Sequence, residues 1–171
     1  MGDIQQMYGF TRTVCDCEVC KQNCRQLSGM IAPEDLRRWQ QQWGKQRFFY
    51  WCMEHLAASP GAIVMHHGQV RRIPTLVPRR LPGGRCHWLT SDDQCAMHAT
   101  APYGCGYFDC QQSRAEGDAR SAACLRSILD DCAQGGLYAE IWLMLRDAGV
   151  TVEAPETIRQ RIQESLSPTA S

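Results

Sequence analysis

The chain has 171 residues, enough for one domain with a real hydrophobic core, so cysteines are not needed merely to make it fold. Lys and Arg together number 18, as do Asp and Glu, and this neutral balance argues against a nucleic-acid-binding protein. No apolar run approaches the roughly 18 residues of a membrane span, and residues 1–10 lack the basic start and apolar core of a secretory signal. The sequence predicts a cytoplasmic protein without a membrane partner, and it leaves a protein partner open.

Cysteine is the anomaly of the composition, at 11 of 171 residues. Thiols in the cytoplasm stay reduced, and clustered thiols there are more often metal ligands or catalytic groups than disulfides. An odd count also leaves at least one thiol unpaired in any disulfide scheme. The sulfur therefore favours a metal site over a disulfide framework.

The first predicted element is a cysteine-rich loop at 15–24, with the spacing C-x-C-x2-C-x3-C. A helix is predicted over 33–43, because Pro33 suits a first helical position and Gly44 ends the pattern. A second helix, over 48–58, has apolar residues at helical spacing until the Ser-Pro-Gly sequence that follows.

Residues 62–78 predict a short hairpin that turns near His67 and Gly68, with Pro74 and Pro78 confining its second strand to an edge. The stretch 78–115 has little periodicity, and so long an irregular segment in a compact domain needs a function or a brace such as a metal.

The remainder predicts helices over 118–134 and 137–149, each with an apolar stripe, and a shorter one after Pro155. The fold class is therefore α+β and predominantly helical: a small irregular domain with a short hairpin and long metal-braced loops. A cysteine-cluster metal-binding domain over 1–150 is expected to precede a C-terminal short helix and flexible tail over 151–171.

Eight cysteines are predicted to lie in loops and to be metal ligands, in two groups: Cys15, Cys17, Cys20 and Cys24, then Cys86, Cys95, Cys105 and Cys110. Thiolates two to four residues apart converge readily on one ion, and four of them are a standard shell for zinc or an iron–sulfur cluster. Either each group makes its own site, or the two groups clamp one site between them. The other three cysteines, Cys52, Cys124 and Cys132, fall on apolar helical faces, where a free thiol behaves as a small hydrophobe.

Histidine and arginine add weaker signals. His98 follows Cys95 by three residues, a spacing that suits a ligand pair, although a lone histidine is more often structural. His66 and His67 are interpreted as a turn or edge pair, and the arginine-rich segment 71–85 as a solvated loop. Catalytic residues are not predicted, because sequence alone places no base beside any of the thiols.

The segment CHWLTSDDQCAMHATAPYGCGYFDC resembles the signature of the YkgJ-like family, cysteine-cluster proteins described as zinc- or iron-chelating. The matching residues are Cys86, Trp88, Leu89, Cys95, Met97, His98, Pro102 and Cys105, and the family's upstream C-x2-C-x3-C matches Cys17, Cys20 and Cys24. The chain departs from the pattern at Arg25, where many relatives have a second cysteine, and at Gly106, where they have arginine. Cys15 is a candidate for the missing thiol. The resemblance implies metal or cluster binding by the eight loop cysteines.

The identity of the metal stays open between iron–sulfur and zinc. Zinc sites of four thiolates usually show two C-x2-C pairs, and here Cys17 and Cys20 form the one clear pair. Uneven spacing favours an iron–sulfur cluster, [4Fe–4S] rather than [2Fe–2S], shielded by Trp88, Tyr103 or Phe108. The predicted function is a metal-binding cysteine-cluster protein with a redox, sensing or accessory role. Its alternatives are a zinc-binding structural or interaction module, and a cluster-dependent protein-modifying enzyme or its accessory, since part of the family is similar to a segment of flagellin lysine methylases.

Overall fold

The computed structural model describes residues 4–13, 15, 17–66 and 68–166. Its elements are α1 (Ile4–Tyr8), α2 (Glu18–Gln26), α3 (Pro33–Trp43), α4 (Lys45–His55), β1 (Leu56–His66), β2 (Gln69–Pro78), the 3-10 turn η1 (His98–Thr100), α5 (Tyr103–Gly106), α6 (Arg114–Ala133), α7 (Leu137–Asp147) and α8 (Pro155–Leu166). The predicted class, a predominantly helical α+β domain with one hairpin, is confirmed.

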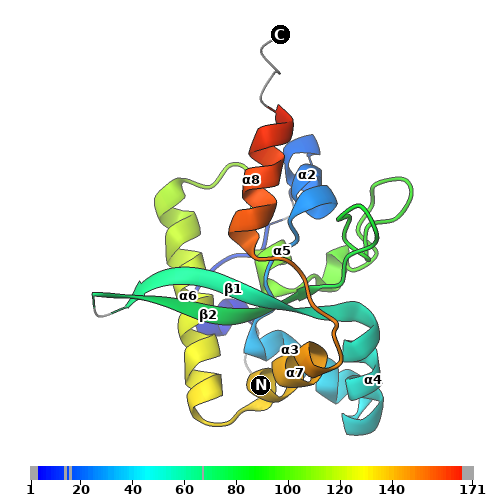
Figure 1. Cartoon of the computed structure of the whole chain (residues 1–171), viewed down its shortest axis with the longest axis vertical. Coiled ribbons are helices and arrows are strands. Elements are labelled where there is room, and N and C mark those ends of the chain that lie inside the picture. The colour runs from blue at the N-terminus through cyan, green and yellow to red at the C-terminus, as the bar shows by residue number, and fades with distance from the viewer. Residues whose placement is uncertain (1–3, 14, 16, 67, 167–171) are drawn as a thin grey trace.

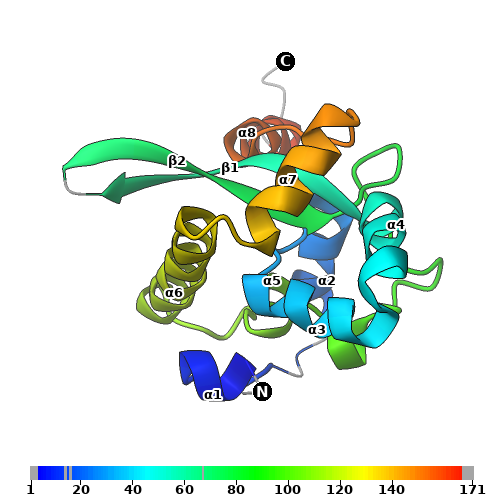
Figure 2. The same ribbon diagram turned by 90° about the horizontal axis from the view of Figure 1, so that it is seen from below.

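The β1–β2 hairpin crosses the middle of the molecule, with α3, α4 and α7 on one side and α2 and α8 on the other (Figure 1). Seen from below, α7 lies across the hairpin and the tip of the hairpin extends beyond the helices (Figure 2). The irregular segment between β2 and α6 contains only η1, α5 and isolated bridges among its described elements, as the sequence predicts.

Local sequence explains most helix boundaries. The predicted helix over 33–43 is confirmed as α3, which has proline in its first turn and Gly44 as its C-cap. Helix α6 begins earlier than predicted, because Ser113 and Glu116 form a capping box in which each accepts the other's backbone N–H. The helix predicted over 137–149 is confirmed as α7, which ends at Asp147, and the helix predicted after Pro155 is confirmed as α8.

Two predicted boundaries are wrong. The helix predicted over 48–58 ends at His55, because the following residues pair with β2 from Leu56 onward. Gly61 lies at the irregularity in that pairing with a φ of 88°, and a Cβ there would lie 1.8 Å from the carbonyl oxygen of Ile73. The cysteine loop is also partly helical, since Cys17 is the N-cap of α2.

The hydrophobic core lies between the hairpin and the helices α3, α4, α6 and α7. Tyr138 joins α7 to β2 and to the segment before α3, because its hydroxyl donates to the carbonyl oxygen of Ile31 over 3.0 Å and accepts the Leu76 N–H over 2.7 Å. Cys52 and Cys124 are buried in this core as predicted, whereas Cys132 is exposed and its predicted apolar position is wrong. The buried face of α6 turns through Cys124 and Ile128 and reaches Asp131 instead of Cys132.

The segment after α7 packs back on the hairpin. Val152 donates its N–H to the carbonyl oxygen of Ala58 over 3.0 Å, and Ala58 donates to that of Val150 over 2.9 Å. Residues 167–171 of the predicted tail lie outside the described part of the chain. Among the described residues, no helix combines the length and the apolar character needed to cross a membrane.

A buried carboxylate joins α3 to the irregular region. Oδ2 of Asp35 accepts the N–H of Ala32 at 2.9 Å and that of Tyr103 at 2.8 Å, and Oδ1 pairs with Arg38 at 2.9 Å. Burial raises the pKa of Asp35 to about 6, while the two amides and Arg38 oppose that rise. The interaction fixes the first turn of α5, which carries Cys105.

We expect Asp35→Ala to lower the free energy of unfolding by about 3 kcal/mol, because two buried N–H groups lose their acceptor. Chemical denaturation of the two proteins measures the difference. Asp118→Ala removes an exposed carboxylate of α6 and serves as the control, with an expected change within about 0.5 kcal/mol. A loss no larger at Asp35 than at Asp118 would contradict this structural role.

Candidate metal centre

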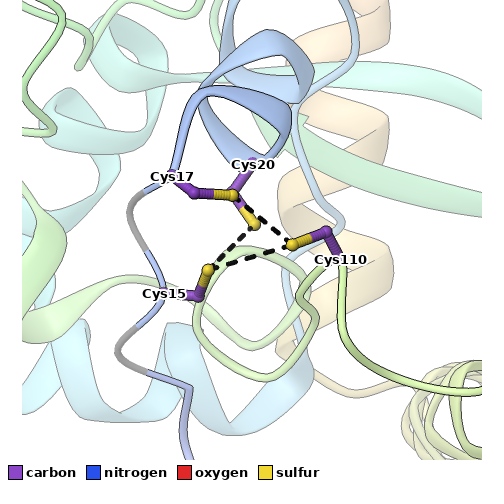
Figure 3. Close-up of side chains that lie close together, drawn as sticks. All are labelled: Cys15, Cys17, Cys20 and Cys110. Carbon is purple, nitrogen blue, oxygen red and sulfur yellow. Dashed lines mark hydrogen bonds between the residues drawn. The ribbon is translucent and has the colours of Figure 1, made fainter.

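Four thiols converge at one place near the surface. Their residues are Cys15, Cys17, Cys20 and Cys110, and the four sulfur atoms all lie within 4.8 Å of one another. The sulfur of Cys110 is 3.4 Å from that of Cys17 and 4.0 Å from that of Cys15, and the sulfurs of Cys20 and Cys15 are 3.6 Å apart. Figure 3 shows Cys15, Cys17 and Cys20 approaching from the N-terminal side and Cys110 from the facing loop.

The start of α2 places two of the thiols. Cys17 is the N-cap, and Cys20 lies on the first turn, so a C-x2-C pair falls on one side of the helix end. The pKa of Cys17 is lowered to about 7, first by the backbone amide of Cys20 and then by the neighbouring thiols of Cys110 and Cys15. A helix N-terminus favours negative charge, so this position suits a thiolate.

The other two thiols come from segments that are joined independently of any metal. Thr13 donates its N–H to the carbonyl oxygen of Gly106 over 2.9 Å and its hydroxyl to Asp109 over 2.6 Å. The same hydroxyl oxygen accepts the N–H of Cys15 over 3.1 Å. Asp109 also accepts the N–H of Gln111 over 2.8 Å, which shapes the turn that presents Cys110.

The thiols of the group differ in how readily they ionise. The pKa of Cys20 is raised to about 12, chiefly by burial. The pKa of Cys110 is raised because its thiol hydrogen-bonds to the sulfur of Cys17. One thiol of the group therefore ionises readily while two of its neighbours resist. A bound cation reverses this, because its charge deprotonates coordinating thiols outright.

The donor set fits a single metal ion. Zinc binds thiolates at about 2.3 Å in a tetrahedron, which requires sulfurs about 3.8 Å apart. The three separations of 3.4, 3.6 and 4.0 Å bracket that value. Sulfurs around a [4Fe–4S] cluster lie further apart, about 6 Å, because an iron separates each one from the cluster centre. The group can therefore bind a metal.

The structure groups the eight predicted ligands differently from their order in the sequence. Cys110 joins the first three cysteines, whereas Cys24 lies a turn further along α2 and its carbonyl oxygen accepts the N–H of Cys86 over 2.9 Å. Cys24, Cys95 and Cys105 line the same large cavity as Cys15, Cys20 and Cys110. Of the four N-terminal cysteines, Cys24 thus contacts the 86–95 segment, whereas the other three gather with Cys110.

Histidine does not join the four-thiol group. The described ligand atoms that gather there are all sulfurs, and the ring of His98 is not among them. His67 and the side chain of His66 lie outside the described part of the structure. Thr13 and Asp109 were missed by the sequence reasoning, since neither belongs to a recognisable motif.

A close backbone contact positions Cys105 and α2. Gly104 donates its N–H to the carbonyl oxygen of Met30 over 2.8 Å. A Cβ on Gly29 would lie 2.0 Å from the carbonyl oxygen of Gly104 and 2.7 Å from the nitrogen of Cys105. Only glycine allows the two chains this approach.

We expect Gly29→Ala to lower the free energy of unfolding by about 3 kcal/mol, since backbone atoms must move to admit the methyl group. Gly117→Ala is the matched control, because its Cβ meets nothing within 4 Å and alanine favours the helix. Denaturant titration compares the two variants. Equal stabilities of the two variants would show that the backbone at Gly29 accommodates a methyl group without cost, and would contradict this expectation.

Cys17 and Cys132 are both exposed, but the pKa of Cys17 is lowered whereas burial of the Cys132 sulfur raises its pKa. In metal-free protein at neutral pH we expect iodoacetamide to modify Cys17 first, Cys132 more slowly, and buried Cys52 and Cys124 last. Peptide mass spectrometry over time measures the order. Faster modification of Cys132 than of Cys17 would contradict the proposed stabilisation of the Cys17 thiolate.

Comparisons with protein families, with curated proteins and with solved structures find no match to this chain. The resemblance to the YkgJ-like family therefore stays a prediction, and the site's geometry carries the functional argument.

Proposed function

We propose that this protein is a zinc-binding module in which one Zn²⁺, held by Cys15, Cys17, Cys20 and Cys110, joins the N-terminal segment to the loop before α6. The spacing of the four sulfurs carries the proposal, because it matches a tetrahedron around a single ion. Zinc in place of an iron–sulfur cluster at this group is the alternative that the sequence left open.

The proposed role is structural. The ligands come from residues 15–20 and from residue 110, so the ion closes a loop of about ninety residues. Four protein ligands leave no open coordination position, which is typical of structural zinc and not of catalytic zinc. Residues around the site already form hydrogen bonds across the same junction, such as the pair Thr13 and Asp109. The ion would then stabilise the contact between the N-terminal segment and the loop before α6, which are already hydrogen-bonded to each other.

Metal binding of this kind is part of the folding free energy. Zinc at 1,000 times its dissociation constant would stabilise the folded state by about 4 kcal/mol. Addition of a chelator is accordingly expected to lower the melting temperature and to expose the N-terminal segment to proteolysis.

We expect Cys110→Ser to remove about one zinc per chain and to lower the melting temperature, because three thiolates hold the ion poorly. Cys132→Ser, at another exposed cysteine, is the matched control and should keep the zinc. Elemental analysis measures zinc, and Co²⁺ substitution reports tetrahedral thiolate coordination by its visible absorption.

Full zinc content in Cys110→Ser, or an unchanged melting temperature after complete zinc removal, would refute the proposal. Iron and sulfide bound at this group in place of zinc, lost in Cys110→Ser, would support the alternative cluster.

A further inference from the structure

The outer edge of β1 is covered along only part of its length within the described chain. Near the start of the strand, Ala58 forms a parallel bridge with Thr151 and exchanges backbone hydrogen bonds with Val150 and Val152. Further along, the backbone of residues 62–65 forms no hydrogen bond outside the β1–β2 ladder among the described residues. Alternate residues of a strand point their N–H and C=O groups away from the ladder partner. The edge at 62–65 therefore presents backbone groups that another strand could pair with.

The sequence of residues 62–65 lacks the charged and proline residues that usually protect a strand edge. The proline of β1 and its irregular pairing lie earlier in the strand, between Ser59 and Ala62. Residues 62–65 are Ala-Ile-Val-Met, and Ile63 and Met65 are 54% and 69% exposed. An open, apolar edge of this kind is a template for strand pairing.

A large cavity borders the same edge. Its volume is about 1650 Å³, and all four of residues 62–65 line it. Successive side chains of a strand point to opposite faces, so a cavity that meets four residues in a row lies along the edge of the strand. The volume exceeds the roughly 300–1,000 Å³ of small-molecule pockets. The cavity therefore has room for a segment of polypeptide.

Helices α6 and α8 lie on opposite sides of the hairpin and form walls of this cavity (Figure 2). Arg72 of β2 forms an ion pair with Glu156 of α8, so one face of the sheet meets α8. Leu125 and Leu129 line the cavity from α6, and Ile158 lines it from α8. A strand added to β1 would lie between the two helices, and its alternating side chains would contact apolar residues on both faces.

The charges of the two helical walls favour an acidic segment. Three carboxylates that line the cavity there already form ion pairs within the chain, namely Asp118, Glu153 and Glu156. Arg126 of α6 and Arg159 of α8 also line the cavity, and neither forms an ion pair in the described part of the chain. Carboxylates of an incoming segment would complement both guanidinium groups. Strand β1 of a second copy has no acidic residue to offer them.

We propose that residues 62–65 of β1 bind an extended, acidic segment of a partner protein by strand addition, in the cavity between α6 and α8. Four residues of a strand span about 13 Å. Main-chain hydrogen bonds along this length would supply affinity, and Arg126 and Arg159 would supply the preference for acidic side chains. The inference uses no cysteine and does not depend on a bound metal.

The first test uses the full chain and a displayed library of octapeptides that is randomised among apolar, acidic and basic residues. We expect selected peptides to be rich in Asp and Glu and poor in Lys and Arg. Selection on the double variant Arg126→Glu, Arg159→Glu should reverse this preference, because both wall charges change sign. Arg47→Glu changes an exposed arginine of α4 outside the cavity and is the matched control, with an unchanged preference expected.

A second test separates strand addition from side-chain binding. The tightest selected peptide is synthesised with N-methyl groups on alternate amides, in two versions that together cover every amide. Only alternate amides of an added strand face β1, so one version should lose about tenfold in affinity for each hydrogen bond removed, and the other should bind normally. Amide hydrogen exchange followed by NMR should slow at alternate positions of 62–65 when the unmethylated peptide binds.

Failure to select any peptide, or selection without a preference for acidic residues, would overturn the proposal. Equal losses from the two N-methylated peptides would contradict strand addition. Slow exchange at 62–65 in a dimer that forms without peptide would also overturn it, because a second copy would then occupy the edge. The N-methylated peptides are tested on the wild-type chain, so this comparison decides even where the double variant does not fold.

Discussion

The contact between Gly29 and Gly104 is the constraint on which both cysteine groups depend. It brings the chain after α2 against the first turn of α5, closely enough that a single Cβ would collide with backbone. Asp35 of α3 also holds α5 in place, because its carboxylate accepts the N–H of Tyr103. With these two segments joined, Cys24 and Cys105 line the same cavity. The loop after α5 carries Cys110 to the start of α2.

The contact brings the thiols of the four-thiol group close enough together to affect one another's ionisation. Thiolates held this close repel one another in the absence of a cation. The pKa of Cys17 is lowered, whereas that of Cys20 is raised chiefly by burial and further by its neighbouring thiols. A folded chain that maintains such a group retains an unfavourable arrangement unless metal completes it. The hydrogen bonds of Thr13 show that the surrounding structure is prepared to hold the ligands in place.

The four-thiol group and the other loop cysteines lie in different environments. Three of the sulfur separations within the four-thiol group are 3.4 to 4.0 Å, and Cys17 and Cys110 lie at the surface. Cys86 is buried, and Cys24 and Cys95 are partly buried and pack against the hydrophobic core. The four-thiol group is therefore the more accessible of the two.

The sequence by itself determined the helical fold class, the hairpin, and α3 with its proline start and glycine end, because caps, periodicity and turn residues act locally. It also predicted eight cysteines as candidate ligands, of which four, Cys15, Cys17, Cys20 and Cys110, gather in the structure. Only the tertiary structure decided that Cys110 joins Cys15, that Cys24 turns to Cys86, and that residues after His55 form a strand. The reason is that ligand grouping and strand pairing depend on contacts between segments that are distant in the sequence. The spacing of cysteines along the chain does not specify which loops a backbone contact, such as that of Gly29, brings together.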